Sequence, residues 1–303
     1  MTFLILSDNN TFSNNLIEKI KQQEKRAKIF TSDFEPENLK KNRKKLDSIS
    51  LCVIFQKQNK AAKLSQQKAM ELSFFTGFCA AKEVPVITNL PCLNEQTFFS
   101  KKEIISFESE ENIYNYIEAK YKQLVKATAQ RLAKNTLFDK GIPFTSDCFA
   151  LYIARNKPQI IDLFLKAGID INSCDDLGTP MLNVAVRNDN EELVKRFVDL
   201  GANINTVSKD RGYTPVMDAV WKGNKAITKY LIEKGADLNT ISKEGQSNLV
   251  LAVGSEKYEI VEMLAKNGAD PDIKDQMGMS AYGYATLFRK EGMIEILKPY
   301  HKE

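Results

Sequence analysis

The feature that most constrains this 303-residue chain is a short motif that returns every 33 or 34 residues. Each copy opens with a glycine and ends four positions later with asparagine or aspartate, at residues 168–172, 201–205, 235–239 and 268–272. Such a period is typical of repeat architectures, in which each unit is too small to bury its own apolar face and stacks on its neighbours. The second half of the chain is therefore predicted to be an array of similar units.

The residues between two copies of the motif predict a pair of helices. Thr214 can cap a helix with its hydroxyl, and Pro215 suits the first helical position, where its missing N–H costs nothing. Ala219 is small enough for a second helix to pack closely, and Gly223 permits a tight turn between the two helices. Equivalent helix starts are expected at Thr179-Pro180, Ser247-Asn248 and Ser280-Ala281.

This period, with its helix starts and the alanine that follows three of them by five residues, resembles the ankyrin repeat. The resemblance covers residues 142–303 and implies an all-α solenoid of about five helix pairs, the outer two acting as caps. It also implies a protein partner on the concave surface made by the hairpin tips and the first helices. The contact residues expected there are Arg211, Tyr213, Asp218, Trp221 and Lys222. Arg, Tyr and Trp dominate interface energetics, although Trp221 has the alternative of packing against a neighbouring repeat.

Residues 1–140 do not repeat, and their apolar runs alternate with helical patterns. Strands are predicted at 2–7, 27–31, 49–55, 84–88 and 104–107, with helices starting at Asn10 or Thr11 and spanning 33–46, 65–82 and 111–135. Strands that are apolar throughout favour a parallel sheet covered on both faces. We therefore expect a flavodoxin-like, doubly wound α/β domain over 1–110 and a connecting helix and linker over 111–141. Ligands of such sheets bind at the carboxyl ends of the strands, here beside Asp8, Asn9, Asn10 and Gln56.

The stretch from Ser65 to Ile87 carries a second resemblance. Ser65 precedes the pair Glu71-Leu72 by six residues, and a Val-Pro-Val-Ile strand follows at 84–87. This pattern resembles TIR domains and nucleoside 2-deoxyribosyltransferases. The resemblance implies that Glu71 faces the sugar carbon of NAD or a nucleoside, with Asp8, Asn9, Asn10, Gln56 and Ser65 binding the substrate. The alternative is an exposed carboxylate that pairs with Lys68 on the same helix.

The composition narrows the chemistry further. His301 is the only histidine and the five cysteines are scattered, which excludes Ser-His-Asp catalysis and argues against metal sites, so no metal or cofactor is expected. No apolar run approaches 18 residues and no signal peptide is recognised, so a cytoplasmic protein without a membrane span is expected. No aromatic residues interleave with the basic run at 40–45, so nucleic acid is not expected as a partner.

Two functions remain open at this point. The first is a protein-interaction role through the repeat surface. The alternative is an effector whose N-terminal domain cleaves an N-glycosidic bond while the repeats sense or target.

Overall fold

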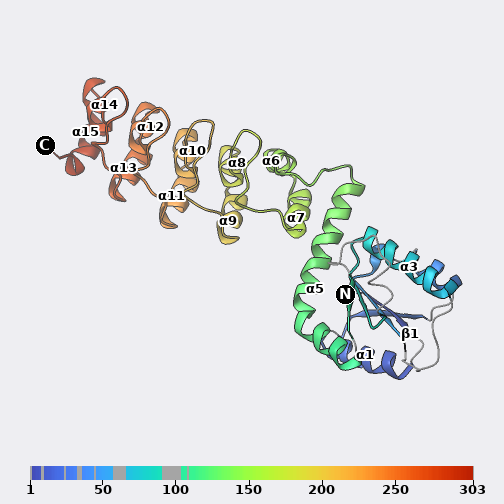
Figure 1. Cartoon of the computed structure of the whole chain (residues 1–303). Coiled ribbons are helices and arrows are strands. Elements are labelled where there is room, and N and C mark those ends of the chain that lie inside the picture. Colours follow the sequence, from blue (N-terminus) through green and yellow to red (C-terminus); the bar gives the residue numbers. More distant parts are fainter. Residues whose placement is uncertain are drawn as a thin grey trace. The chain divides into compact units, whose positions relative to one another are not determined.

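The computed structural model describes residues 2–7, 10–23, 25–32, 36–43, 46–56, 66–90, 104–107 and 109–302. The chain divides into two compact units, residues 1–133 and 134–303. Each unit is described by itself below (Figure 1).

The first unit contains a five-stranded, wholly parallel sheet among its described residues. The strands are β1 (Thr2–Ser7), β2 (Lys28–Ser32), β3 (Leu51–Phe55), β4 (Val86–Thr88) and β5 (Ile104–Ser106). Their order is β2-β1-β3-β4-β5, the order of flavodoxin-like folds. The predicted doubly wound α/β domain is therefore confirmed.

Both faces of the sheet are buried, which explains why its strands are apolar throughout. On one face, Leu4 and Leu6 of β1 pack with Leu72 and Phe75 of α3 (Gln66–Ala81). On the other face, Phe3 and Ile5 of β1 pack with side chains of α1 (Asn10–Gln23) and α5 (Glu110–Asp139). The remaining elements are α2 (Pro36–Arg43) and the 3-10 turn η1 (Leu46–Ser48).

Helix α5 does more than connect the two units. Its N-terminal half places Ile113 and Ile117 in the core beneath the sheet. Further along, Arg131 donates to the carbonyl oxygens of Lys82 (2.6 Å) and Ile49. The first unit therefore extends to residue 133 rather than ending near 110, because the apolar face of α5 covers the sheet.

The second unit is a stack of five helix pairs, as the repeat period predicts. Its bounds are α6 (Ser146–Ala154) and α7 (Pro158–Ala167), α8 (Met181–Arg187) and α9 (Glu191–Asp199), α10 (Pro215–Lys222) and α11 (Lys225–Glu233), α12 (Asn248–Gly254) and α13 (Tyr258–Lys266), and α14 (Ala281–Leu287) and α15 (Glu291–Leu297), followed by the 3-10 turn η2 (Lys298–Tyr300). Ala219, Ala252 and Ala285, which follow three helix starts by five residues, are all 0% exposed.

The helix starts agree with the predicted caps in three repeats and differ in one. The hydroxyls of Thr214, Ser247 and Ser280 each accept a hydrogen bond from the backbone of the first turn. In the second repeat the cap position is Pro180, which offers no side-chain bond, and α8 begins at Met181. The backbone N–H of Thr179 instead donates to Asp175 Oδ1 (2.7 Å) in the preceding loop.

The repeated Gly-x-Asx-x-Asx motif forms a ladder of hydrogen bonds from one repeat to the next. Asn172 Oδ1 accepts from Asn203 N (2.7 Å), Asn205 Oδ1 from Asp237 N (2.9 Å), and Asn239 Oδ1 from Asp270 N (2.8 Å). The motif that marks the period thus also joins neighbouring repeats.

Candidate functional site: the inner face of the repeat stack

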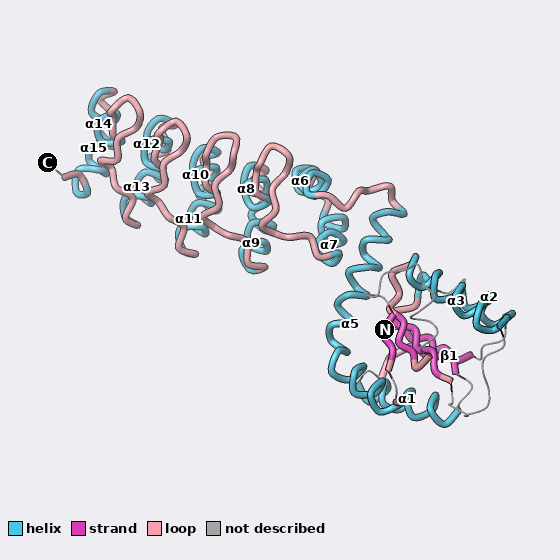
Figure 2. The backbone as a smooth tube through the Cα atoms, viewed as in Figure 1, coloured by secondary structure: helices cyan, strands magenta, loops and turns pink. Residues whose placement is uncertain are grey.

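The first helices of the pairs, α6, α8, α10, α12 and α14, lie in one row, and the loops before the last four arch beside them (Figure 2). We call these loops the fingers and number each one by its repeat, so that the third finger precedes α10 and the fourth precedes α12. The row of first helices with its fingers is the inner face. Helix α8 packs on α10, α10 on α12, and α12 on α14.

A regular turn sets the register of the inner face. The turn after each first helix contains one residue with a positive φ, namely Asn156, Asp189, Gly223, Glu256 and Arg289. Two positions before these residues stand Ala154, Arg187, Trp221, Gly254 and Leu287; one position before stand Arg155, Asn188, Lys222, Ser255 and Phe288. Both sets lie at the C-terminal ends of the first helices, and we call each set of equivalent positions a column.

Three of the predicted contact residues are exposed on this face. The Trp221 side chain is 50% exposed. Next to it, Lys222 Nζ lies 3.4 Å from Asp189 Oδ2 in the turn of the preceding repeat. Arg211 is exposed on its finger, and its guanidinium carbon lies 6.0 Å from the centre of the Tyr213 ring.

The other two predicted contact residues are buried. Tyr213 is 5% exposed, and its hydroxyl donates to Gln246 Oε1 of the next finger (3.2 Å). Asp218 is 1% exposed, and its carboxylate is directed into the stack. Neither side chain is accessible to a partner, because each is buried by contacts between neighbouring repeats.

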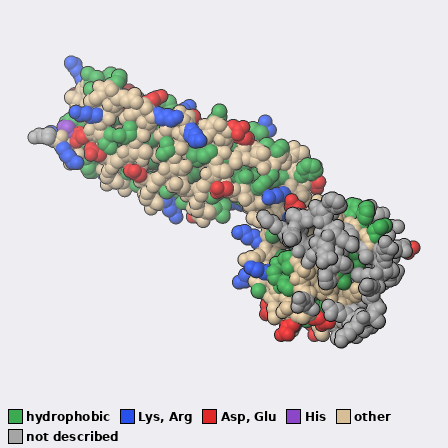
Figure 3. All heavy atoms as spheres, viewed as in Figure 1, with side chains coloured by type: hydrophobic (Ala, Val, Ile, Leu, Met, Phe, Trp, Pro, Cys, Tyr) green, Lys and Arg blue, Asp and Glu red, His purple; other side chains and the backbone are tan. Residues whose placement is uncertain are grey.

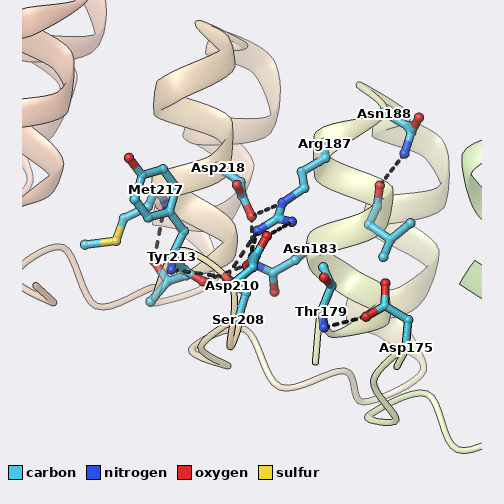
Figure 4. Close-up of polar contacts among 12 residues, drawn as sticks. Asp175, Thr179, Asn183, Arg187, Asn188, Ser208, Asp210, Tyr213, Met217 and Asp218 are labelled. Atoms are coloured by element: carbon cyan, nitrogen blue, oxygen red, sulfur yellow. Dashed lines mark hydrogen bonds and ion pairs between the residues drawn. The ribbon is translucent and has the colours of Figure 1, made fainter. Parts of the chain in front are cut away.

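Asp218 belongs to a polar cluster that joins α8, α10 and the finger between them (Figure 4). Arg187 Nε lies 2.9 Å from Asp218 Oδ2, and its terminal nitrogens contact Asp210 Oδ2 (2.7 Å) and Ser208 Oγ (3.1 Å). Asn183 Nδ2 also donates to Asp218 Oδ2 (2.8 Å). One guanidinium thus ties a finger tip to two neighbouring helices, with the fork geometry that arginine provides.

The two carboxylates held by Arg187 differ in electrostatics. Burial raises the pKa of Asp218, although Arg187 and Asn183 oppose this change. The hydrogen bond with Arg187 lowers the pKa of Asp210 well below its ordinary value, since this carboxylate is 31% exposed. The directions differ because desolvation dominates at the buried site and ion pairing at the exposed one.

Neither Arg187 nor Asn183 belongs to a motif that the sequence marks. Their roles depend on the register of α8, which begins one residue later than the Thr-Pro pattern predicted. The sequence signal that could have placed Arg187 in the column of Trp221 is the turn residue two positions later, Asp189 in one repeat and Gly223 in the next.

The fingers are also linked to one another. Lys209 N donates to Gly178 O (2.9 Å), and Lys243 N donates to Arg211 O (3.3 Å). Gln276 Nε2 donates to Lys243 O (2.8 Å). These bonds hold successive finger tips in a row, so the exposed side chains between them stand on a rigid support.

Comparison with known proteins agrees with this geometry. The family model described as "Ankyrin repeats (3 copies)" matches residues 149–242 and 207–275. An ankyrin repeat-containing protein of Treponema pallidum (strain Nichols) is 30% identical over 215 residues, which cover 71% of this chain and 72% of the relative. The chain belongs to the ankyrin repeat proteins. Ankyrin repeats support a protein-interaction role in general.

The alignment with the treponemal relative is longer than the ankyrin stack. Its 215 residues exceed what residues 134–303 can supply, so it extends into the first unit. At least 45 of the aligned residues therefore precede residue 134.

The predicted site in the α/β domain is only partly described. Asp8, Asn9 and Ser65 lie outside the described residues, as do the side chains of Asn10 and Glu71. Gln56 is described: its backbone N–H donates to Asn89 Oδ1 (2.9 Å), and its carbonyl accepts from Asn89 Nδ2 (2.7 Å). Asn89 therefore joins the ends of β3 and β4, and the role of Glu71 stays a prediction.

Two further observations concern the described part of the chain. No group of three His, Cys, Asp or Glu side chains in it is placed to hold a metal ion. No described helix is long and apolar enough to cross a membrane.

Proposed function

We propose that this ankyrin repeat protein binds a protein partner through its inner face, with Trp221, Arg211 and Lys222 in the contact. The observation that carries the proposal is the half-exposed indole of Trp221 on α10. Tryptophan and arginine are the residue types most enriched in interface hot spots, and both are presented here on neighbouring parts of one repeat.

The support beneath these side chains favours binding. Asp218 and Arg187 fix α10 to α8, and Tyr213 fixes the third finger to the fourth. A surface that is rigid before binding loses less conformational entropy when a partner docks. The buried residues thus serve the proposed contact by positioning the exposed ones.

The surface of the repeat stack also suits a protein partner. On the face of the stack seen in Figure 3, hydrophobic side chains are interspersed with Lys, Arg, Asp and Glu. This mixture is typical of non-obligate interfaces, which are about as apolar as the rest of a protein surface. A cytoplasmic location is part of the proposal, since described cysteines such as Cys148 and Cys174 are free thiols.

The test is an alanine substitution at Trp221 in the full chain. Peptides or proteins selected to bind the wild-type protein should bind Trp221→Ala about 30-fold more weakly, the equivalent of a 2 kcal/mol hot spot. Phe138→Ala is the matched control, because Phe138 is 83% exposed but lies on α5 and outside the inner face. Equal loss in both variants, or no loss in either, would contradict the proposed site.

A further inference from the structure

One position in the column of Trp221 has no side chain. Arg187, Trp221, Gly254 and Leu287 occupy equivalent places on α8, α10, α12 and α14. A Cβ atom built on Gly254 would meet nothing within 4 Å. Trp221 on one side is 50% exposed, and Leu287 and Phe288 on the other side are each 61% exposed. We call this gap in the column, at Gly254 between Trp221 and Leu287 with Phe288, the Gly254 notch.

Nothing in the fold requires glycine at this position. Gly254 is the last residue of α12 and is not among the glycines with positive φ. Packing does not require it either, because the space above it is open. A glycine in a helix is less favourable than alanine, so Gly254 lowers the stability of α12 although no turn or close contact requires it. What it does provide is room for an atom from outside the chain.

The size of the notch fits one segment of a partner. Packed helices lie about 8–10 Å apart, so the positions of Trp221 and Leu287, two helices apart, are separated by roughly 16–20 Å. A single polypeptide segment, about 10–12 Å across as a helix with its side chains, can enter between them.

Basic residues stand at both ends of the helices that line the notch. Lys209, Arg211 and Lys243 are exposed on the third and fourth fingers, before the N-terminal ends. Lys257 and Arg289 are exposed in the turns after the C-terminal ends. Seven or eight helical residues, about 10–12 Å, separate the two groups.

Most acidic residues of this region are already engaged. Asp210 and Asp218 are held by Arg187, and Glu256 is held by Lys290. Within residues 109–302, no ion pair engages the five basic residues Lys209, Arg211, Lys243, Lys257 and Arg289. On the third and fourth fingers, two acids are likewise outside any ion pair, Asp237 and Glu244, so the basic residues are in excess. The potential offered to a partner is therefore positive around an apolar centre.

We propose that the Gly254 notch seats a large apolar side chain of an acidic segment of the protein partner, whose carboxylates face the basic residues on either side. This inference rests on the proposed function and names the partner's chemistry. Complementary charges steer association and select the partner, while the apolar side chain anchors it by displacing water from the exposed Trp221 and Leu287.

The experiment uses the full chain and a phage-displayed library of random 16-residue peptides. The expected binders combine at least one Leu, Ile, Phe, Met or Trp with more Asp and Glu than Lys and Arg. Three of them are synthesised with a fluorescent label, and their Kd values are measured by anisotropy at 50 mM and 500 mM NaCl. Binding should weaken at least tenfold at the higher salt, because salt screens exposed charges.

Two substitutions fill the notch, Gly254→Phe and Gly254→Leu. Each should weaken peptide binding at least tenfold while the circular dichroism spectrum and melting temperature stay near those of the wild type. The matched control is Ala154→Phe, at the equivalent exposed position of the first repeat, which should change the Kd less than twofold. Lys257→Glu with Arg289→Glu should also weaken binding at least tenfold, whereas Lys229→Glu on the second helix of the third repeat should not.

The outcomes separate the two proposals. Peptides that lose affinity for Trp221→Ala but bind both Gly254 variants normally would overturn the notch and leave the proposed function standing. Peptides rich in Lys and Arg would overturn the acidic partner. Peptides indifferent to every inner-face substitution, or a selection that yields no binder, would count against the notch and the proposed function together.

Discussion

Replacing Arg187 by methionine removes the guanidinium that holds two carboxylates. Asp218 is 1% exposed and would keep only the amide of Asn183, at 2.8 Å. Breaking a buried ion pair by deleting one partner costs about 3–5 kcal/mol, because a buried charge is left uncompensated. Arg187 is itself 23% exposed, so we expect the lower end, about 3 kcal/mol. With a urea dependence of roughly 2 kcal/mol per molar, the midpoint should fall by about 1.5 M.

The loss should depend on pH in a defined direction. Burial already raises the pKa of Asp218, and removing Arg187 removes the positive charge that opposes this rise. A carboxyl group whose folded pKa exceeds its unfolded value of about 3.9 loses stability as the pH rises through the folded pKa. The deficit of Arg187→Met should therefore be smaller at pH 5 than at pH 7. Asp210 does not add to this difference between pH 5 and pH 7. Because its pKa is lowered, its contribution to the free energy of unfolding is lost only when the pH falls below the ordinary pKa of a carboxyl group.

The assay is urea unfolding of the full chain at both pH values, followed by circular dichroism and by tryptophan fluorescence. Trp221 is the only tryptophan and lies on the same helix as Asp218, so its fluorescence reports on this part of the stack. Asp210→Asn is the control for the exposed pair and should cost no more than about 1 kcal/mol. Arg187→Met combined with Asp218→Asn should recover at least half of the loss. A midpoint shift below about 0.5 M, or an equal shift at pH 5, would refute the reasoning.

Three further results are expected. Ala219→Leu should destabilise the stack by roughly 1–3 kcal/mol, because Ala219 is 0% exposed between packed helices; an unchanged urea midpoint would show that the site has room. Ser247 caps α12, because its hydroxyl accepts a hydrogen bond from Val250 N (3.2 Å). Ser247→Ala should therefore lower the free energy of unfolding by about 1 kcal/mol and Ser247→Gly by only a few tenths, and equal shifts in melting temperature would show that the cap does not contribute. If the α/β domain releases the free base from NAD or deoxynucleosides, Glu71→Gln should abolish the release, and equal release from the variant would exclude Glu71 as the reacting carboxylate.

Much of the fold could be predicted because its signals are local. The five apolar runs of the first half become the five strands of a parallel sheet, and the predicted strand starts and ends differ from the observed ones by no more than two residues. The caps at Thr214, Ser247 and Ser280 each depend on one hydroxyl and the first turn of the same helix. Signals of this kind act over a few residues and can be read without knowing what the helix packs against.

The extent of the α/β domain could not be predicted in the same way. The sequence predicted a helix over 111–135, but it did not reveal which surface the apolar side of that helix covers. In the structure this surface is the parallel sheet, whose strands β1 and β3 lie more than fifty positions earlier in the chain. Domain boundaries depend on such distant contacts.

The sequence by itself determined the repeat period, the helix pairs and the family, because each repeat encodes its own helix caps, turns and small packing residues. Only the tertiary structure decided which side chains of the inner face are available to a partner. Tyr213 and Asp218 are buried and bond to Gln246 and Arg187, which lie about one repeat away in the sequence. Trp221 stays exposed next to the repeat that carries Gly254. The physical reason is that exposure at one position of a stack is set by the side chains of the neighbouring repeats, and these vary where the period does not.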